Sequence, residues 1–473
     1  MKILTSILIF LLHNYAQAQV KPLLMPVVDS AFIAKHTYKD LDAALKNPND
    51  VYGLDLSHTL TITQIFQLKK IRNLRKLDFV TYQKKFPFEV SQLENLQELR
   101  LIGDSLDFAD IFIKLSSLKN LKKLSLTRNK FEVLPQEITK LTQITALDIS
   151  NCYFLKLIDA LEKITQLPNL ENLDISKKDP SICTFHFDVV PTTDFVPSDI
   201  DKNEKVHFED VLVKKLVQLK KLKVLNLSNC QLERLPVGLE KLTNLVSLDV
   251  SNNEKLGFSS EVLDKLSTLP NLKKLKIQFN QDSLTVLLPK EIIKFTQLTH
   301  LDLSGSSFEH FPKELVKLRK LESLKLDNSI SVLSSEIGEL INLEELSLAG
   351  NDLTNLPRGI KRLLKLKQLD LSHNSFKIFP KEIGDLPNLI NLNLQYNELE
   401  IISGDIGQLK KLEYLDLKHN ELTSLPKELE NLSFLKILYL DNNPLTTIFT
   451  SLFPFLERLD YGNSEDIEQL IKK

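Results

Sequence analysis

Residues 343–351 read LEELSLAGN, and three variants of this nine-residue motif follow: LKQLDLSHN at 366–374, LINLNLQYN at 389–397 and LEYLDLKHN at 412–420. Their first residues are 23 residues apart. About seventeen copies extend over residues 51–463, at intervals of 22 to 27 residues with one longer gap. A period of this length indicates a solenoid, in which each unit buries its apolar face only against its neighbours.

The motif itself predicts a short strand followed by an inward-pointing amide. We number its places one to nine from the first apolar residue. Leucines at places four and six lie on the same face of a strand, and each contributes roughly 1.5–3 kcal/mol when buried by a neighbouring unit. Asn at place nine can satisfy backbone groups that have left the sheet. In this numbering we expect Leu371 to be buried and Ser372 to be exposed, and Cys152 and Cys230, which hold place nine, to be buried.

The pattern L-x-x-L-x-L-x-x-(N/C)-x-L resembles that of the leucine-rich repeat family. Several units continue as Leu/Phe-Pro-x-x-Ile/Leu-x-x-Leu, as at Leu356-Pro357 and Leu425-Pro426. This continuation is similar to a 23-residue subclass found in bacterial proteins and in intracellular Ras-binding relatives. The resemblance implies an α/β repeat solenoid, a leucine-rich repeat horseshoe. Its parallel β-sheet would form the concave face, and short 3₁₀, helical or extended segments the convex face.

The two ends of the chain carry their own signals. Residues 1–18 contain Lys2, an apolar run at 3–12 and an A-x-A site at 16–18, which predict a secretory signal peptide and a secreted, periplasmic or cell-surface protein. We expect residues 19–50 to form an N-terminal cap, with a short helix that begins near Thr37 and covers the first strand. Residues 464–473 would form a closing tail with a small helix.

One interruption breaks the repeat, at about residues 177–207. A surface excursion and a recognition finger are both consistent with its composition, and the alternation at 184–188 fits an edge strand. Asp199, Asp201 and Asn203 have calcium-loop spacing, with Asp210 at the twelfth place, but Glu204 stands where the turn of such a loop requires Gly. We therefore expect no metal.

Composition and the absence of motifs exclude several functions. The formal net charge is −2, or −3 without residues 1–18, which gives no reason to expect nucleic acid or an anionic membrane as a partner. Nor is a span expected, because no stretch after residue 12 is long and apolar enough. Three cysteines cannot make a paired disulfide framework. No phosphate loop, H-E-x-x-H, C-x-x-C or G-x-S-x-G motif occurs. We expect no catalysis and no cofactor.

The candidate recognition site lies on the variable places of the last units. Place eight holds His373, Tyr396 and His419 in successive units, and strands ~4.8 Å apart would make of them a ridge roughly 10 Å long. The two histidines are too far apart to share one metal ion. The other candidates are aromatic or acidic and amide residues at places three and five: Tyr414, Tyr439, Asp370, Asn393 and Asp416.

Two interpretations of the acidic residues at place five stay open. Together with upstream Asp148, Asp174, Asp249 and Asp302, they would favour a basic or amine-bearing partner. Alternatively, Asp and Asn at this place serve solubility alone. The function that we expect is non-catalytic binding of a protein or surface macromolecule by the concave face, outside the cytoplasm. The alternatives are an intracellular signalling scaffold like the Ras-binding relatives, and an enzyme or ion-regulated protein built around the insertion.

Overall fold

The computed structural model describes residues 30–56, 62–81, 86–103, 106–177, 208–253, 255–256, 259–278, 287–446, 456 and 458–460. The chain divides into two compact units, one of residues 1–127 and 135–144 and the other of residues 128–134 and 145–473. The expected signal peptide (1–18), nearly all of the insertion (178–207) and the closing helix (464–470) lie outside the described residues.

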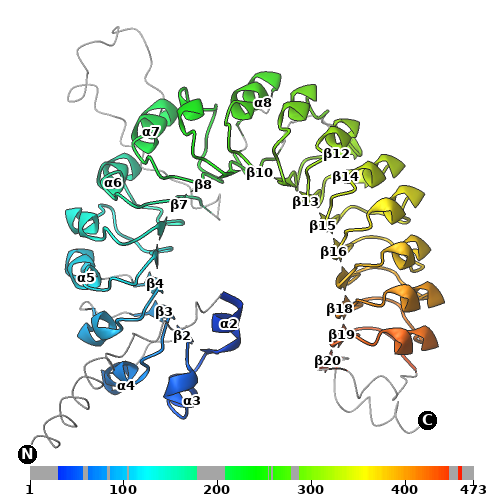
Figure 1. The fold of residues 1–473 in the computed structure, drawn as a ribbon, viewed down its shortest axis with the longest axis horizontal. Coiled ribbons are helices and arrows are strands. Elements are labelled where there is room, and N and C mark those ends of the chain that lie inside the picture. Colours follow the sequence, from blue (N-terminus) through cyan, green and yellow to red (C-terminus); the bar gives the residue numbers. More distant parts are fainter. Residues whose placement is uncertain are drawn as a thin grey trace, which may run out of the picture. The chain divides into compact units, whose positions relative to one another are not determined.

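In the first unit, parallel strands alternate with short helical segments (Figure 1). The strands are β1 (Thr37–Tyr38), β2 (Gly53–Leu56), β3 (Lys76–Val80), β4 (Glu98–Ile102) and β5 (Lys123–Ser125). The α-helices are α2 (Ser30–Lys35), α3 (Leu41–Ala44), α4 (Ile62–Gln67) and α5 (Phe108–Leu115). The 3₁₀ segments are η1 (Pro48–Asp50), η2 (Leu68–Lys70), η3 (Phe88–Gln92) and η4 (Gln136–Lys140).

The second unit repeats this arrangement with more strands, which form one layer while the helical segments form the other (Figure 1). Its sheet contains β6 (Ala146–Asp148), β7 (Asn172–Asp174), β8 (Val224–Asn226), β9 (Ser247–Asp249), β10 (Lys274–Lys276), β11 (His300–Asp302), β13 (Ser323–Lys325), β15 (Glu345–Ser347), β16 (Gln368–Asp370), β17 (Asn391–Asn393), β18 (Tyr414–Asp416), β19 (Ile437–Tyr439) and β20 (Arg458–Asp460). A separate parallel pair consists of β12 (Phe308–His310) and β14 (Ile330–Val332).

The helical layer of the second unit changes character along the chain. Its α-helices are α6 (Leu157–Ile164), α7 (Phe208–Leu216) and α8 (Ser260–Ser267). Its 3₁₀ segments are η6 (Leu239–Lys241), η7 (Lys290–Lys294), η8 (Lys313–Lys317), η9 (Ser335–Glu339), η10 (Arg358–Arg362), η11 (Lys381–Asp385), η12 (Gly404–Gln408) and η13 (Lys427–Asn431). The units that carry the Leu/Phe-Pro sequence thus use 3₁₀ turns, in which Pro at the N-terminus removes no required donor.

The register of the sheet confirms the motif. Leu346, Leu369, Leu392, Leu415 and Leu438, all at place four, are direct partners on successive strands. They are buried, as are the leucines at place six. β7 pairs directly with β8, so the sheet continues across the chain interruption without an intervening strand.

The expectation for Leu371 is confirmed, but the one for Ser372 is wrong. Leu371 is fully buried, and Ser372 is only 4% exposed. Place seven lies where the chain turns away from the strand, and its backbone groups are bonded on both sides: the N–H donates to Asp370 and the carbonyl accepts from Gly350 and Asn374. This hydrogen bonding, rather than the alternation of a strand, places Ser372 inside.

Asn at place nine points inward, as expected. The Asn374 amide donates to the carbonyls of Leu348 and Leu371, at 2.9 and 3.0 Å, and its oxygen accepts from the Leu353 N–H at 2.8 Å. Each such asparagine therefore joins its own repeat to the preceding one. Cys152 and Cys230 are buried at the same place, and the Cys230 thiol lies 3.5 Å from the Ile175 carbonyl.

The N-terminal edge differs from the expectation that a helix covers the first strand. Thr37 belongs to β1, which pairs in parallel with β2. The helix α3 begins later, with Asp40 as its N-cap accepting from the Ala43 N–H at 2.7 Å. A strand rather than a helix covers β2 because the open edge of β2 presents backbone groups that need backbone partners.

Candidate functional site

Place eight has the same backbone conformation in most repeats of the second unit. His373, Tyr396 and His419 have φ of 52°, 53° and 53°, in the left-handed region. Their N–H groups donate to the place-seven carbonyl of the next repeat at 2.8–2.9 Å, so the sheet hydrogen bonding fixes this conformation. Other repeats place residues suited to it at the same position: Asn151, Asn229, Asn252, Asn328, Asn442, Gly305 and Gly350.

The three predicted aromatic residues form a continuous stack. The ring centroids of His373 and Tyr396 are 4.4 Å apart with an interplanar angle of 14°, and those of Tyr396 and His419 are 4.0 Å apart at 9°. Tyr396 is 43% exposed. The stack is bounded by Gly350, which has no side chain, and by Asn442, whose amide nitrogen lies 3.1 Å from Nε2 of His419.

Tyr414 and Tyr439 form a second aromatic contact on the sheet face. Their rings meet edge to face, with centroids 5.6 Å apart. The Lys418 ammonium lies over the Tyr439 ring at 3.9 Å and pairs with Asp441 at 3.5 Å. Tyr414 donates to Asp416 at 3.1 Å. Burial and the neighbouring Asp416 carboxylate raise the pKa of Tyr414, so it stays a neutral donor.

The acidic and amide residues at place five are engaged within the protein. One oxygen of Asp370 accepts from the Ser372 N–H at 2.9 Å, and the other from the Asn393 amide at 3.2 Å. Asn393 and Asp416 accept from the N–H two residues on in the same way, and Asp416 is buried. Asp or Asn at place five therefore closes the strand end. Neither the amine-binding interpretation nor the solubility interpretation anticipated this role.

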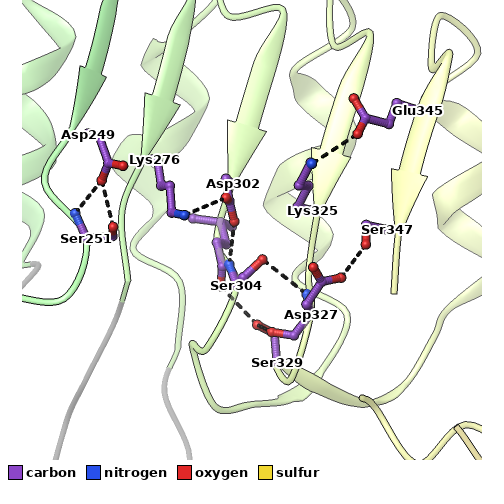
Figure 2. Close-up of polar contacts among 11 residues, drawn as sticks. Asp249, Ser251, Lys276, Asp302, Ser304, Lys325, Asp327, Ser329, Glu345 and Ser347 are labelled. Atoms are coloured by element: carbon purple, nitrogen blue, oxygen red, sulfur yellow. Dashed lines mark hydrogen bonds and ion pairs between the residues drawn. The ribbon is translucent and has the colours of Figure 1, made fainter. Parts of the chain in front are cut away.

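A second polar network lies on the sheet between β9 and β15, and sequence reasoning missed it. Figure 2 shows Lys276 paired with Asp302 at 3.3 Å and Lys325 paired with Glu345 at 3.1 Å, both across neighbouring strands. Ser347 donates to Asp327 at 2.5 Å. The two lysines neutralise Asp302 and Glu345, so Asp302 does not contribute an unpaired negative charge. Comparing place five between successive repeats would have revealed the pairing of Lys276 with Asp302, whereas Glu345 lies at place three of its unit.

Burial changes the acidity of groups in the second unit. It raises the pKa of Asp249 and of Asp327, although serine hydroxyls donate to both carboxylates. It also raises the pKa of the Cys152 thiol to about 12, which keeps this thiol protonated and unreactive. Asp210, the twelfth residue of the calcium-like spacing, bonds instead to Arg234 and to the Val237 N–H.

Within the described residues, no helix has the length and apolar character needed to cross a bilayer. No cluster of three metal-ligating side chains occurs among them either.

Comparisons with known proteins agree with the repeat architecture. Family models described as leucine rich repeat match residues 341–399, 365–422 and 387–445, and a two-copy model matches residues 220–262. The solved structure of a leucine-rich repeat protein of Leptospira interrogans is 31% identical, covers 90% of this chain and 99% of its own, and has a TM-score of 0.50.

The curated relatives match only part of this chain. TMV resistance protein N of Nicotiana glutinosa is 29% identical over 157 residues, which is 32% of this chain. The adenylate cyclase of Schizosaccharomyces pombe is 26% identical over 271 residues, which is 56% of this chain. The match spans only 12% of the length of each of these relatives. What the similarities share is the repeat region, which is typically non-catalytic, and the chain belongs to the leucine-rich repeat family.

Proposed function

We propose that this protein is a non-catalytic binding scaffold that acts outside the cytoplasm and docks a protein partner beside β16–β19. The observation that carries the proposal is the stack of His373, Tyr396 and His419, in which the first two side chains are exposed and His419 is half-buried. Aromatic side chains that are rigid and partly exposed supply contact area at low entropic cost, as interface hot spots do.

The backbone supports a binding role for the stack. A bulky residue with positive φ is uncommon, because its Cβ is crowded, and such strain costs of order 1–3 kcal/mol. Tyr396 accepts this strain where most other units have Asn or Gly, although Arg128 also occupies this place with positive φ. Its two stacking contacts, at about 0.5–1.5 kcal/mol for each pair, offset a cost of this size. Stability alone therefore gives little reason for Tyr at this place, whereas partner binding gives one.

The test compares capture by the chain from Gln19 onward and by its Tyr396→Asn/His419→Asn variant, with mass spectrometry of what each retains from surface and secreted fractions. Phe434→Asn is the matched control, because it removes a 60%-exposed ring outside the stack. We expect a partner that the wild type and the control retain and the double variant loses. Equal capture by all three would overturn the proposal.

The location has its own test. If residues 1–18 are a signal peptide, the mature protein recovered from cells begins at Gln19, and intact-mass measurement detects this. A protein that retains residues 1–18 would instead favour the intracellular scaffold. The binding experiment does not depend on this outcome, because both alternatives use the same surface.

A further inference from the structure

A row of carboxylates runs beside the aromatic stack. It consists of Asp352, Glu398 and Glu421 at place ten of successive or nearby units, with Glu400 two residues further on. We call these four residues the acidic margin. They are exposed, apart from Glu398, which is half-buried.

Burial shows that the stack and the acidic margin both face outward. Tyr396 is exposed, Asn397 is buried, Glu398 is half-buried, Leu399 is buried and Glu400 is exposed. Asn397 and Leu399 thus point inward, and the residues on either side of each of them point outward. Because successive residues advance the chain by at most ~3.3–3.6 Å, the Tyr396 ring and the Glu398 carboxylate belong to one continuous surface.

Three of the four carboxylates in the acidic margin are not neutralised, in contrast to Asp302 and Glu345 in Figure 2. Among places eight to twelve of these units Lys377 is the one lysine or arginine, and its ammonium lies 3.7 Å from Glu398. Asp352, Glu400 and Glu421 make no ion pair with any part of the chain that the structure describes. Three exposed charges of one sign therefore remain next to the stack.

Apolar side chains continue the same surface. Ile378 and Ile401 follow at place thirteen, are joined by a parallel bridge, and are 61% and 57% exposed. The surface thus offers aromatic rings, carboxylates and aliphatic groups in adjacent rows. A carboxylate beside an aromatic ring suits a guanidinium, which pairs with the one and stacks on the other, while phosphate-bearing partners would be repelled.

We propose that the acidic margin and the stack dock a basic, arginine-containing peptide segment of the protein partner. This inference rests on the proposed function and names the chemistry of what binds. Arginine is favoured over lysine, because its planar group both stacks on rings and makes bidentate bonds to carboxylates.

The experiment measures fluorescence anisotropy of labelled octa-arginine, octa-lysine and octa-glutamate with the chain from Gln19 onward. The test variant is Asp352→Asn/Glu400→Gln/Glu421→Gln. The matched control is Asp385→Asn/Glu240→Gln/Glu336→Gln, which removes three exposed charges from the 3₁₀ side that also make no ion pair within the described residues. Both variants change the net charge equally, so any difference between them reports position.

We expect octa-arginine to bind several-fold more tightly than octa-lysine, and octa-glutamate not to bind. The test variant should raise the Kd of octa-arginine at least tenfold, the control less than twofold, and Tyr396→Asn should abolish the preference for arginine. Equal effects of the two triple variants, or no binding of octa-arginine to the wild type, would overturn the inference. If octa-arginine fails while the native partner is still lost from the Tyr396→Asn/His419→Asn variant, the partner class is wrong and the proposed function stands.

Discussion

The rings of Tyr396 and His419 lie 4.0 Å apart and nearly parallel, although the two residues are separated by a whole repeat in the sequence. Each ring extends from a left-handed residue whose N–H is held by the next repeat. The contact therefore depends on the spacing of neighbouring strands. In the binding role proposed above, such a preformed surface would need little ordering.

Replacing Tyr396 by Asn should leave the free energy of unfolding within about 1 kcal/mol of the wild type, because relief of about 1–3 kcal/mol of strain offsets two lost stacking contacts. Tyr396→Ala should be less stable than Tyr396→Asn, since Asn tolerates the left-handed conformation better. Thermal unfolding of both variants checks this. A loss well above 2 kcal/mol in Tyr396→Asn would show that the ring is a core residue.

Leu371→Ala should lower the free energy of unfolding by about 2–5 kcal/mol, because the fully buried side chain leaves a cavity. Gln368→Ala on the same repeat is the control, and we expect a change within about 0.5 kcal/mol, since Gln368 is exposed. Urea denaturation measures both. Similar losses in the two variants would mean that the register of the strand is wrong.

Asn397→Ala should cost about 2–4 kcal/mol, because it strands the buried carbonyls of Leu371 and Leu394 and the N–H of Phe376. Asn397→Ser should cost less. Ser329 holds the same place in its own unit and donates to two carbonyls at 2.9 Å. Denaturant unfolding should show the wild type as most stable, then Asn397→Ser, then Asn397→Ala. The hydrogen bonds of the inward-pointing asparagines require this order.

Asp249→Asn should become more stable than the wild type as the pH rises. Burial raises the pKa of Asp249 in the folded protein, so ionisation above its ordinary pKa of ~3.9 costs folding free energy that the neutral amide avoids. Asn226 already accepts the equivalent backbone hydrogen bond in a neighbouring repeat. The unfolding curves of Asp249→Asn and of the wild type should nearly coincide at pH 3 and separate at pH 7. A variant less stable than the wild type at pH 7 would contradict this account.

The left-handed conformation at place eight was open to sequence reasoning but was not predicted. Asn and Gly recur there, and both favour positive φ. The repeat pattern alone is therefore enough to mark Arg128, His373, Tyr396 and His419 as unusual residues at this place. The burial of Ser372 was different in kind, because it results from hydrogen bonds to Gly350, Asp370 and Asn374 at the end of the strand.

The sequence by itself determined the repeat, the buried leucines, the inward asparagines and the column of His373, Tyr396 and His419, because a fixed period makes equivalent places neighbours. Only the tertiary structure decided which charges remain available. Asp370 and Asp416 accept hydrogen bonds at the strand ends, and Asp302 pairs with Lys276 on the neighbouring strand. Asp352 and Glu421 stay exposed. Charge pairing depends on distances of a few ångströms between side chains, and periodicity along the chain does not specify them.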